Sequence, residues 1–283
     1  MWFLDALAGG FRHPTDEARM QYFRIALGLA LTVRFLLALG HGGWSRFIPG
    51  SYSAFALTRR IGARRFRRFA RVYRPILAAR PAAALALATG VLPRLSALLV
   101  IGALAFELIY AKSPNTLRYA IFMTGALALA GAIGTGLPEH RTSTYNTWSQ
   151  CLAVLITTDL YWNSAWQKAR SAQFRTGLYL AQWLHVHTEV KDRLPAGEHF
   201  IPHVVGRHLG DLSPRSSRTC RLLALAVIAL EVLLPPALLI GQTRTGAVVV
   251  GIAMHAGFSC LKPRQLVAFS SISVASYLLF AAV

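Results

Sequence analysis

The sequence predicts an all-α fold, a bundle of about seven membrane-spanning helices with additional interfacial or re-entrant helices. Apolar runs of roughly 20 residues recur along the chain, and short polar pieces separate them. Hydrophobic residues make up 54% of the sequence and charged residues only 14%. The runs are apolar on all sides, whereas a water-soluble helix carries one apolar stripe. We therefore expect residues 1–283 to form a single transmembrane domain.

The first predicted span covers about Met20 to Leu39 and carries Arg24 and Arg34. Thr15 and the two acidic residues after it favour a helix start just before this span. Residues 1–14 are mixed in character and fit a short helix on the membrane surface.

A basic segment follows at residues 41–80. Nine arginines and no acidic residue lie between Arg59 and Arg80, and apolar residues interleave with them. We expect either a cytoplasmic loop or an interfacial basic helix against anionic lipid. A docking surface for an acidic partner or peptide is the alternative.

The other predicted spans alternate with turns and two polar regions. A half-length apolar stretch at Phe174–Leu184 is too short to span and is expected to be re-entrant or interfacial. Residues 185–220 form a hydrophilic loop that contains several histidines. The spans themselves are Pro81–Leu92, Leu95–Tyr110, Leu117–Leu137, Trp148–Lys168, Leu222–Ile240, Ala247–Leu261 and Val267–Val283, and Pro235 and Pro236 are expected to break or kink the sixth.

The net charge of +19 does not indicate a nucleic-acid-binding protein. The basic residues lie in the pieces between apolar runs, where the positive-inside rule places them. Membrane lipid is therefore the expected partner of this charge, and nucleic acid is not.

The span that ends at Lys168 also contains Asp159, and a charge inside a membrane usually has a partner or a function. The two residues are nine positions apart, so in a helix they face opposite sides and lie about 13.5 Å apart along the axis. They cannot pair within one helix. Lys168 shares a stripe with Tyr161 and Ser164, while Asp159 shares the opposite stripe with Asn163.

Two interpretations of Lys168 stay open. A lysine at the end of a span can extend its ammonium group to the lipid headgroups. Alternatively, a lysine desolvated by burial can accept a proton as a general base.

Glu231 and His255 lie inside separate spans and are candidate functional residues on that ground. Each is equally compatible with a satisfied hydrogen bond between helices. Arg24, Arg34 and Glu107 could supply counter-charges, which would give a buried ionic network without chemistry.

No metal site is predicted. His199 and His203 have the four-residue spacing of a helical metal pair. However, Pro202 lies between them, no glutamate follows His199, and the spacing fixes no third ligand.

Several stretches resemble the HTTM family, the membrane domain shared with vitamin K-dependent gamma-carboxylase. Tyr22–Gly28 resembles the family's first-helix pattern, and Asp159–Lys168 is similar to its helix that ends in lysine. Further similarities, in chain order, are Phe174, Gly177, Glu231, the Arg244 turn and the Met254-His255 pair.

In the carboxylase, a reduced quinone reacts with oxygen, and the strong base that results removes a proton from a peptide glutamate. The family's lysine is the base that acts on the quinol. The resemblance implies this role for Lys168, with His255 and Glu231 lining a pocket for menaquinol or a vitamin K-like quinol. The other candidates for the substrate or cofactor pocket are Tyr161, Ser164, Asp159, Asn163, Arg24 and Glu107.

The chain also departs from the carboxylase pattern. Ser113–Thr116 stands where that branch has a histidine, and the sequence ends without the large extramembrane substrate domain. The size resembles the short bacterial branch, whose members help to mature secreted peptide toxins. We therefore expect an enzyme or maturation factor of a bacterial cytoplasmic membrane that modifies a peptide or lipid, with a secreted precursor peptide and a companion protein as partners. The alternative is a non-catalytic transporter, immunity factor or assembly scaffold.

Overall fold

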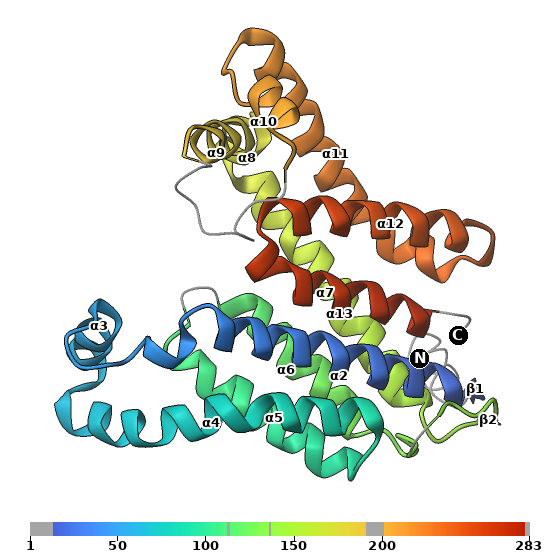
Figure 1. The fold of residues 1–283 in the computed structure, drawn as a ribbon. Coiled ribbons are helices and arrows are strands. Elements are labelled where there is room, and N and C mark those ends of the chain that lie inside the picture. Colours follow the sequence, from blue (N-terminus) through green and yellow to red (C-terminus); the bar gives the residue numbers. More distant parts are fainter. Residues whose placement is uncertain (1–13, 112–113, 136, 191–200, 281–283) are drawn as a thin grey trace. The chain divides into compact units, whose positions relative to one another are not determined.

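The computed structural model describes residues 14–111, 114–135, 137–190 and 201–280, and these are predominantly helical (Figure 1). The all-α prediction is confirmed. The chain forms two compact units, Met1–Ala153 and Val154–Val283, which we call unit 1 and unit 2. Helix α7 begins in unit 1 and ends in unit 2. The expected surface helix at residues 1–14 lies almost entirely outside the described residues.

Unit 1 is built around two long helices, α2 and α4, that pack along each other. Helix α5 packs against α4 and α6, so the helices form a continuous layered core. The elements are β1 (Thr15–Asp16), α2 (Glu17–Gly40), a 3-10 turn η1 (Gly43–Ser45), α3 (Tyr52–Ile61), α4 (Ala63–Thr89), α5 (Pro93–Leu108), α6 (Pro114–Ala128), β2 (Thr142–Ser143) and the first part of α7 (Thr147–Arg170).

The predicted helix start before the first span is present in α2. Asp16 is the N-cap, and its carboxylate accepts a hydrogen bond of 3.0 Å from the backbone N–H of Ala18. The strand residues Thr15 and Asp16 pair antiparallel with Ser143 and Thr142. This pairing joins the start of α2 to the segment before α7.

Helices α2 and α4 approach closely at one glycine. A Cβ atom at Gly28 would lie 2.6 Å from the backbone nitrogen of Ala88, so a larger residue there would separate the helices. Four residues earlier, the fully buried Arg24 donates from Nη1 to the carbonyl oxygens of Leu87 and Ala88, at 2.8 and 2.7 Å. These carbonyls belong to the last turn of α4, where a cation is favoured.

The basic segment 41–80 is largely helical rather than a loop. Helix α4 runs from Ala63 through Pro75 and Pro81 to Thr89, so the span expected from Pro81 is its second half. The reason is helical spacing: Phe69, Tyr73 and Leu77 are buried four residues apart on one face. Their burial outweighs the hydrogen bonds that the two prolines remove.

Unit 2 contains the remaining helices. Helix α12 packs against α11 and α13, and α9 packs against α10 and α11. Their bounds are α8 (Ala172–Arg175), α9 (Leu178–Glu189), α10 (His203–Leu209), α11 (Pro214–Leu239), α12 (Gly241–Leu261), α13 (Pro263–Ser276) and a final 3-10 turn η3 (Tyr277–Phe280).

Three details of unit 2 refine the sequence expectations. The region 185–220 contains the end of α9, all of α10 and the start of α11, so its described part is mostly helix. The prolines Pro235 and Pro236 do not end α11, which continues to Leu239. The short stretch at 174–184 is interrupted at Gly177, whose φ of 75° and close approach to Arg221 of α11 both require glycine.

Three helices of the described residues are long and apolar enough to cross a membrane: Glu17–Gly40, Pro214–Leu239 and Gly241–Leu261. A shorter apolar helix covers Leu266–Phe280. About seven spans are therefore not clearly seen. Helices α5 and α6 have 16 and 15 residues, which is short for a membrane crossing. Helix α7 is long enough, but it carries many polar side chains.

Candidate functional site

Unit 2 encloses a cavity of about 320 Å³ between α7, α8, α9, α11, α12 and α13. Its volume lies at the lower end of the roughly 300–1,000 Å³ that small-molecule sites occupy. The walls are mainly apolar and aromatic, and a few polar groups converge on them, as in most ligand pockets. The large wall residues include Phe174, Tyr179, Trp183, Val227, Phe258 and Phe269.

Lys168 lies in this wall and is held by two acceptors. Its Nζ donates to Ser164 Oγ at 2.9 Å and forms an ion pair with Glu231 Oε1 of α11. Ser164 Oγ also donates to the same carboxylate oxygen, at 3.1 Å. The ammonium nitrogen lies 5.6 and 5.3 Å from the ring centres of Phe174 and Phe258. Tyr161, Ser164 and Lys168, which the sequence placed on one face of the helix, thus all line the cavity.

Glu231 is the more deeply buried partner. Only 3% of its side chain is exposed, against 22% for Lys168. Its second oxygen, Oε2, is buried and has no hydrogen-bond partner in the parts of the chain that the structure describes. A buried carboxylate oxygen without a donor is unfavourable, so this atom is available to a ligand hydroxyl.

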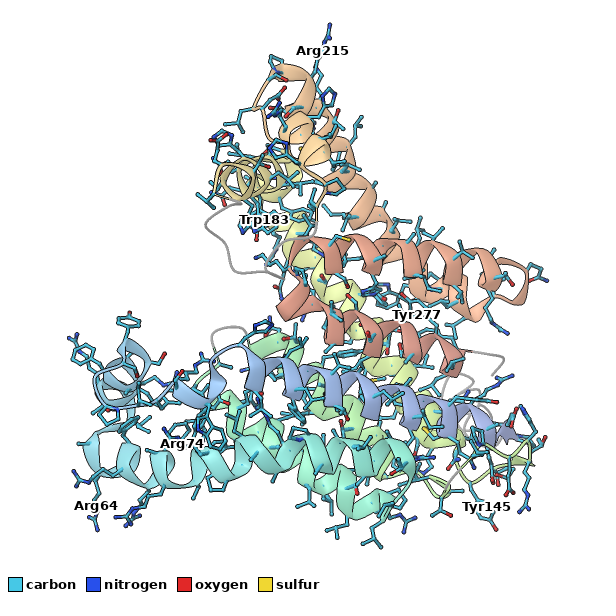
Figure 2. The ribbon with its side chains drawn as sticks, in the orientation of Figure 1. Arg64, Arg74, Tyr145, Trp183, Arg215 and Tyr277 are labelled. Carbon is cyan, nitrogen blue, oxygen red and sulfur yellow. The ribbon has the colours of Figure 1, made fainter. Side chains whose placement is uncertain are left out.

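Tyr161 and His255 form a second polar group in the wall. The Tyr161 hydroxyl lies 2.6 Å from His255 Nε2 and 2.5 Å from the Tyr277 hydroxyl, and His255 Nδ1 lies 3.2 Å from Ser270 Oγ. All four residues are buried. Tyr277, which follows α13 and is labelled in Figure 2, approaches because Gly251 of α12 has no side chain.

Sequence analysis did not find Tyr277, Ser270 or Lys262. No spacing signal linked the first two to His255, because they lie in and just after another helix, α13. Lys262 directly follows the predicted span Ala247–Leu261; it lines the cavity and donates to Tyr179 OH at 3.2 Å.

Asp159 and Asn163 do not line the cavity. Both are exposed, and the Asn163 amide oxygen accepts a hydrogen bond of 2.9 Å from Gln167 Nε2. The sequence geometry placed them opposite Lys168, and the structure agrees.

Arg24 and Glu107 belong to unit 1 and do not line the cavity either. Arg24 binds the end of α4. Glu107 accepts hydrogen bonds from Arg34 and, at 2.9 Å, from Arg80. The Arg80 guanidinium also lies 4.6 Å from the ring centre of Phe35. This set joins α2, α4 and α5.

No cluster of three or more histidine, cysteine or carboxylate residues that could hold a metal occurs in the described part of the chain. His203 begins α10, and His199 lies outside the described residues. His185 is engaged with the Gly210 carbonyl at 2.8 Å.

No protein-family model, curated protein or solved structure matches the chain. The residues of the cavity are therefore the basis on which a function is proposed.

Proposed function

We propose that the chain is an HTTM-like multi-pass enzyme or maturation factor of a bacterial cytoplasmic membrane, and that the unit 2 cavity is its reaction site. It modifies a peptide or lipid by quinol-dependent, carboxylase-like proton abstraction. The supporting observation is the Lys168–Glu231 pair in the wall of an apolar cavity. An ionic pair facing a space lined by aromatic rings is expected where a lipophilic ligand exchanges a proton.

A reduced quinone fits the groups that are present. Its flat ring suits walls formed by Phe174, Trp183 and Phe258, and its hydroxyl suits the open Oε2 atom of Glu231. A bound quinol would supply an ionisable hydroxyl and the oxygen-dependent formation of a strong base. The protein must then bind the ring, orient the hydroxyl and take its proton.

Lys168 is the residue that takes the proton. A protonated lysine has no lone pair, so it must first lose a proton, and the hydrogen bond to Glu231 gives that proton a direct acceptor. Ser164 donates a hydrogen bond to Glu231 and accepts one from Lys168, so it holds the two side chains next to each other.

Tyr161 and His255 extend the path for protons. The phenol lies in the cavity wall and touches the imidazole directly, so a shift of one hydrogen along this bond moves a proton away from the ligand. Ser270 fixes the other ring nitrogen, which orients the imidazole.

The test compares Lys168→Arg and Lys168→Ala with Arg170→Ala, an exposed position at the end of the same helix. Arginine retains the ion pair but cannot act as a base. We expect both Lys168 variants to lose the mass change of the modified product in the producing strain, while Arg170→Ala keeps it. Quinone copurifying with the wild-type protein would be detected by mass spectrometry. An unchanged product from Lys168→Arg would rule out the catalytic role.

A non-catalytic membrane protein is the second candidate. The observation in its favour is the Glu107 network of unit 1, where buried charges join α2, α4 and α5. If Lys168–Glu231 has only this structural role, Lys168→Arg should be fully active. A gene for a small secreted precursor peptide and one for a companion protein beside this gene would favour maturation instead.

A further inference from the structure

A second hollow, in unit 1, is lined by two arginines and three aromatic rings. It has a volume of about 280 Å³ and lies between the segment after η1, helix α3 and the end of α5. The arginines are Arg46 and Arg60, and the rings are those of Phe47, Tyr52 and Tyr110. This hollow shares no residue with the cavity of unit 2.

The two arginines are not neutralised. Arg46 lies over the rings of Tyr110 and Phe47, at 5.1 and 5.7 Å from their centres. Arg60 donates to the backbone carbonyl of Ile109. Neither forms an ion pair with a carboxylate within the described residues, and no acidic side chain lines the hollow. The positive charge is therefore available to an anion.

The acidic residue three positions before Tyr110 of the hollow cannot supply that anion. Glu107 is already bound by Arg34 and Arg80. No other acid occurs between Glu17 and the end of α5. Within the described part of the chain no carboxylate balances Arg46 and Arg60, so their charge can be balanced by an anion from another molecule.

The surface around the hollow combines aromatic and basic side chains. Tyr52 and Phe55 of α3 are 78% and 63% exposed, although both are large and apolar. The adjoining half of α4 exposes a row of arginines, of which Figure 2 labels Arg64 and Arg74. The opposite face of α4 is packed into the apolar cluster of Phe47, Leu57, Phe69, Tyr73 and Leu77. Exposed aromatic rings next to arginines are typical of a surface at the headgroup level of a membrane.

We propose that this hollow binds the phosphate of an anionic phospholipid headgroup, with Arg46 and Arg60 as its ligands. Guanidinium groups bind phosphate through paired, charge-assisted hydrogen bonds. Tyr52 and Phe55 insert beside the headgroup, and the arginines of α4 attract the same leaflet. A free phosphate ion would use the same ligands but would leave these two rings exposed to water, so lipid is the favoured source.

The full chain, purified in detergent, is titrated with phosphatidylglycerol, and the bound lipid is counted by native mass spectrometry. We expect each of Arg46→Gln and Arg60→Gln to weaken binding about fivefold, and the double variant more than tenfold. The matched control is Arg67→Gln with Arg71→Gln, which removes two exposed charges of α4 outside the hollow. Its effect should be less than threefold at physiological salt, because exposed charges are screened.

Four results would overturn the proposal. An equal loss in the control pair means a diffuse electrostatic attraction without a site. Equal binding of phosphatidylcholine means that the hollow does not distinguish an anionic headgroup from one without net charge. Displacement of the lipid by millimolar inorganic phosphate, or by polyglutamate, assigns the hollow to a free anion or an acidic peptide. The variants Arg46→Lys and Arg60→Lys, together with thermal unfolding of every variant, separate a lost ligand from a lost fold. Retained lipid binding by properly folded glutamine variants would also overturn it.

Discussion

Lys168 and Glu231 form an ion pair whose two partners are covered very unequally. The Glu231 side chain is nearly inaccessible, at 3% exposure, while the Lys168 side chain is 22% exposed and its ammonium group lies over two aromatic rings. The partners are 63 residues apart and come from α7 and α11. Both side chains line the cavity, so a ligand there would meet the lysine ammonium group and the open Oε2 atom of Glu231.

Removal of the lysine should destabilise unit 2 strongly. Lys168→Ala leaves Glu231 buried without its counter-charge, and breaking one side of a buried pair costs about 3–5 kcal/mol. The double variant Lys168→Met with Glu231→Gln should recover most of that loss, because it leaves no buried charge. Thermal unfolding in detergent measures both. If the double variant were no more stable than Lys168→Ala, the ion pair would not be the source of the effect.

The sequence located one side of this site but not the other. Helical geometry placed Tyr161, Ser164 and Lys168 on one face of α7, and that face lines the cavity. Glu231 and His255 were candidates because they are ionisable residues within apolar spans. Their partners could not be assigned, because contacts between helices depend on packing, which the spacing within one helix does not encode. Asp159 and Arg24 entered the candidate list by the same rule and lie outside the cavity.

Gly251 should control the position of Tyr277. A Cβ atom there would lie 2.6 Å from the Tyr277 hydroxyl. This hydroxyl is hydrogen-bonded to the Tyr161 hydroxyl, 2.5 Å away. Gly251→Ala should therefore displace the ring and reduce stability by about 1–3 kcal/mol.

The control for this prediction is Gly246→Ala in the same helix, where nothing lies within 4 Å of the added atom. It should be neutral or stabilising by up to about 1 kcal/mol, because alanine favours helix. Thermal unfolding of the two variants gives the comparison. Equal effects would show that the close contact at Gly251 has no consequence.

Glu107 should contribute far more to the free energy of unfolding than an exposed glutamate does. Glu107→Gln leaves Arg34 and Arg80 without their carboxylate, and Arg80 is only 3% exposed, so we expect a loss of about 3–5 kcal/mol. The matched change Glu139→Gln breaks the Glu139–Arg141 pair, whose side chains are 63% and 74% exposed. An exposed pair contributes about 0–1 kcal/mol. Similar unfolding temperatures for the two variants would contradict a stabilising role for the buried network.

The fold was predictable in class but not in every boundary. Apolar runs identified α2, α11 and α12, which are the helices of spanning length and composition. The start of α4 was missed because its first half is rich in arginine, and only the spacing of its buried residues indicates a helix. The end of α6 was placed at Leu137, whereas the helix stops at Ala128, before a segment with Gly131 and Gly134. Composition alone does not distinguish an apolar loop from the last turns of a helix.

Filling the cavity should abolish ligand binding without harming the fold. Val227 of α11 lines the cavity, and Val227→Phe adds a ring to a space of about 320 Å³. The control is Val249→Phe of α12, where the side chain is 62% exposed and does not line the cavity. We expect quinone to copurify with Val249→Phe as with the wild type and to be lost from Val227→Phe, as measured by mass spectrometry of the extracted protein. Lys168→Arg should retain the quinone, because the cavity keeps its shape and its positive charge. Quinone bound equally to both phenylalanine variants would place the ligand outside this cavity, and the base proposed for Lys168 would then have no substrate beside it.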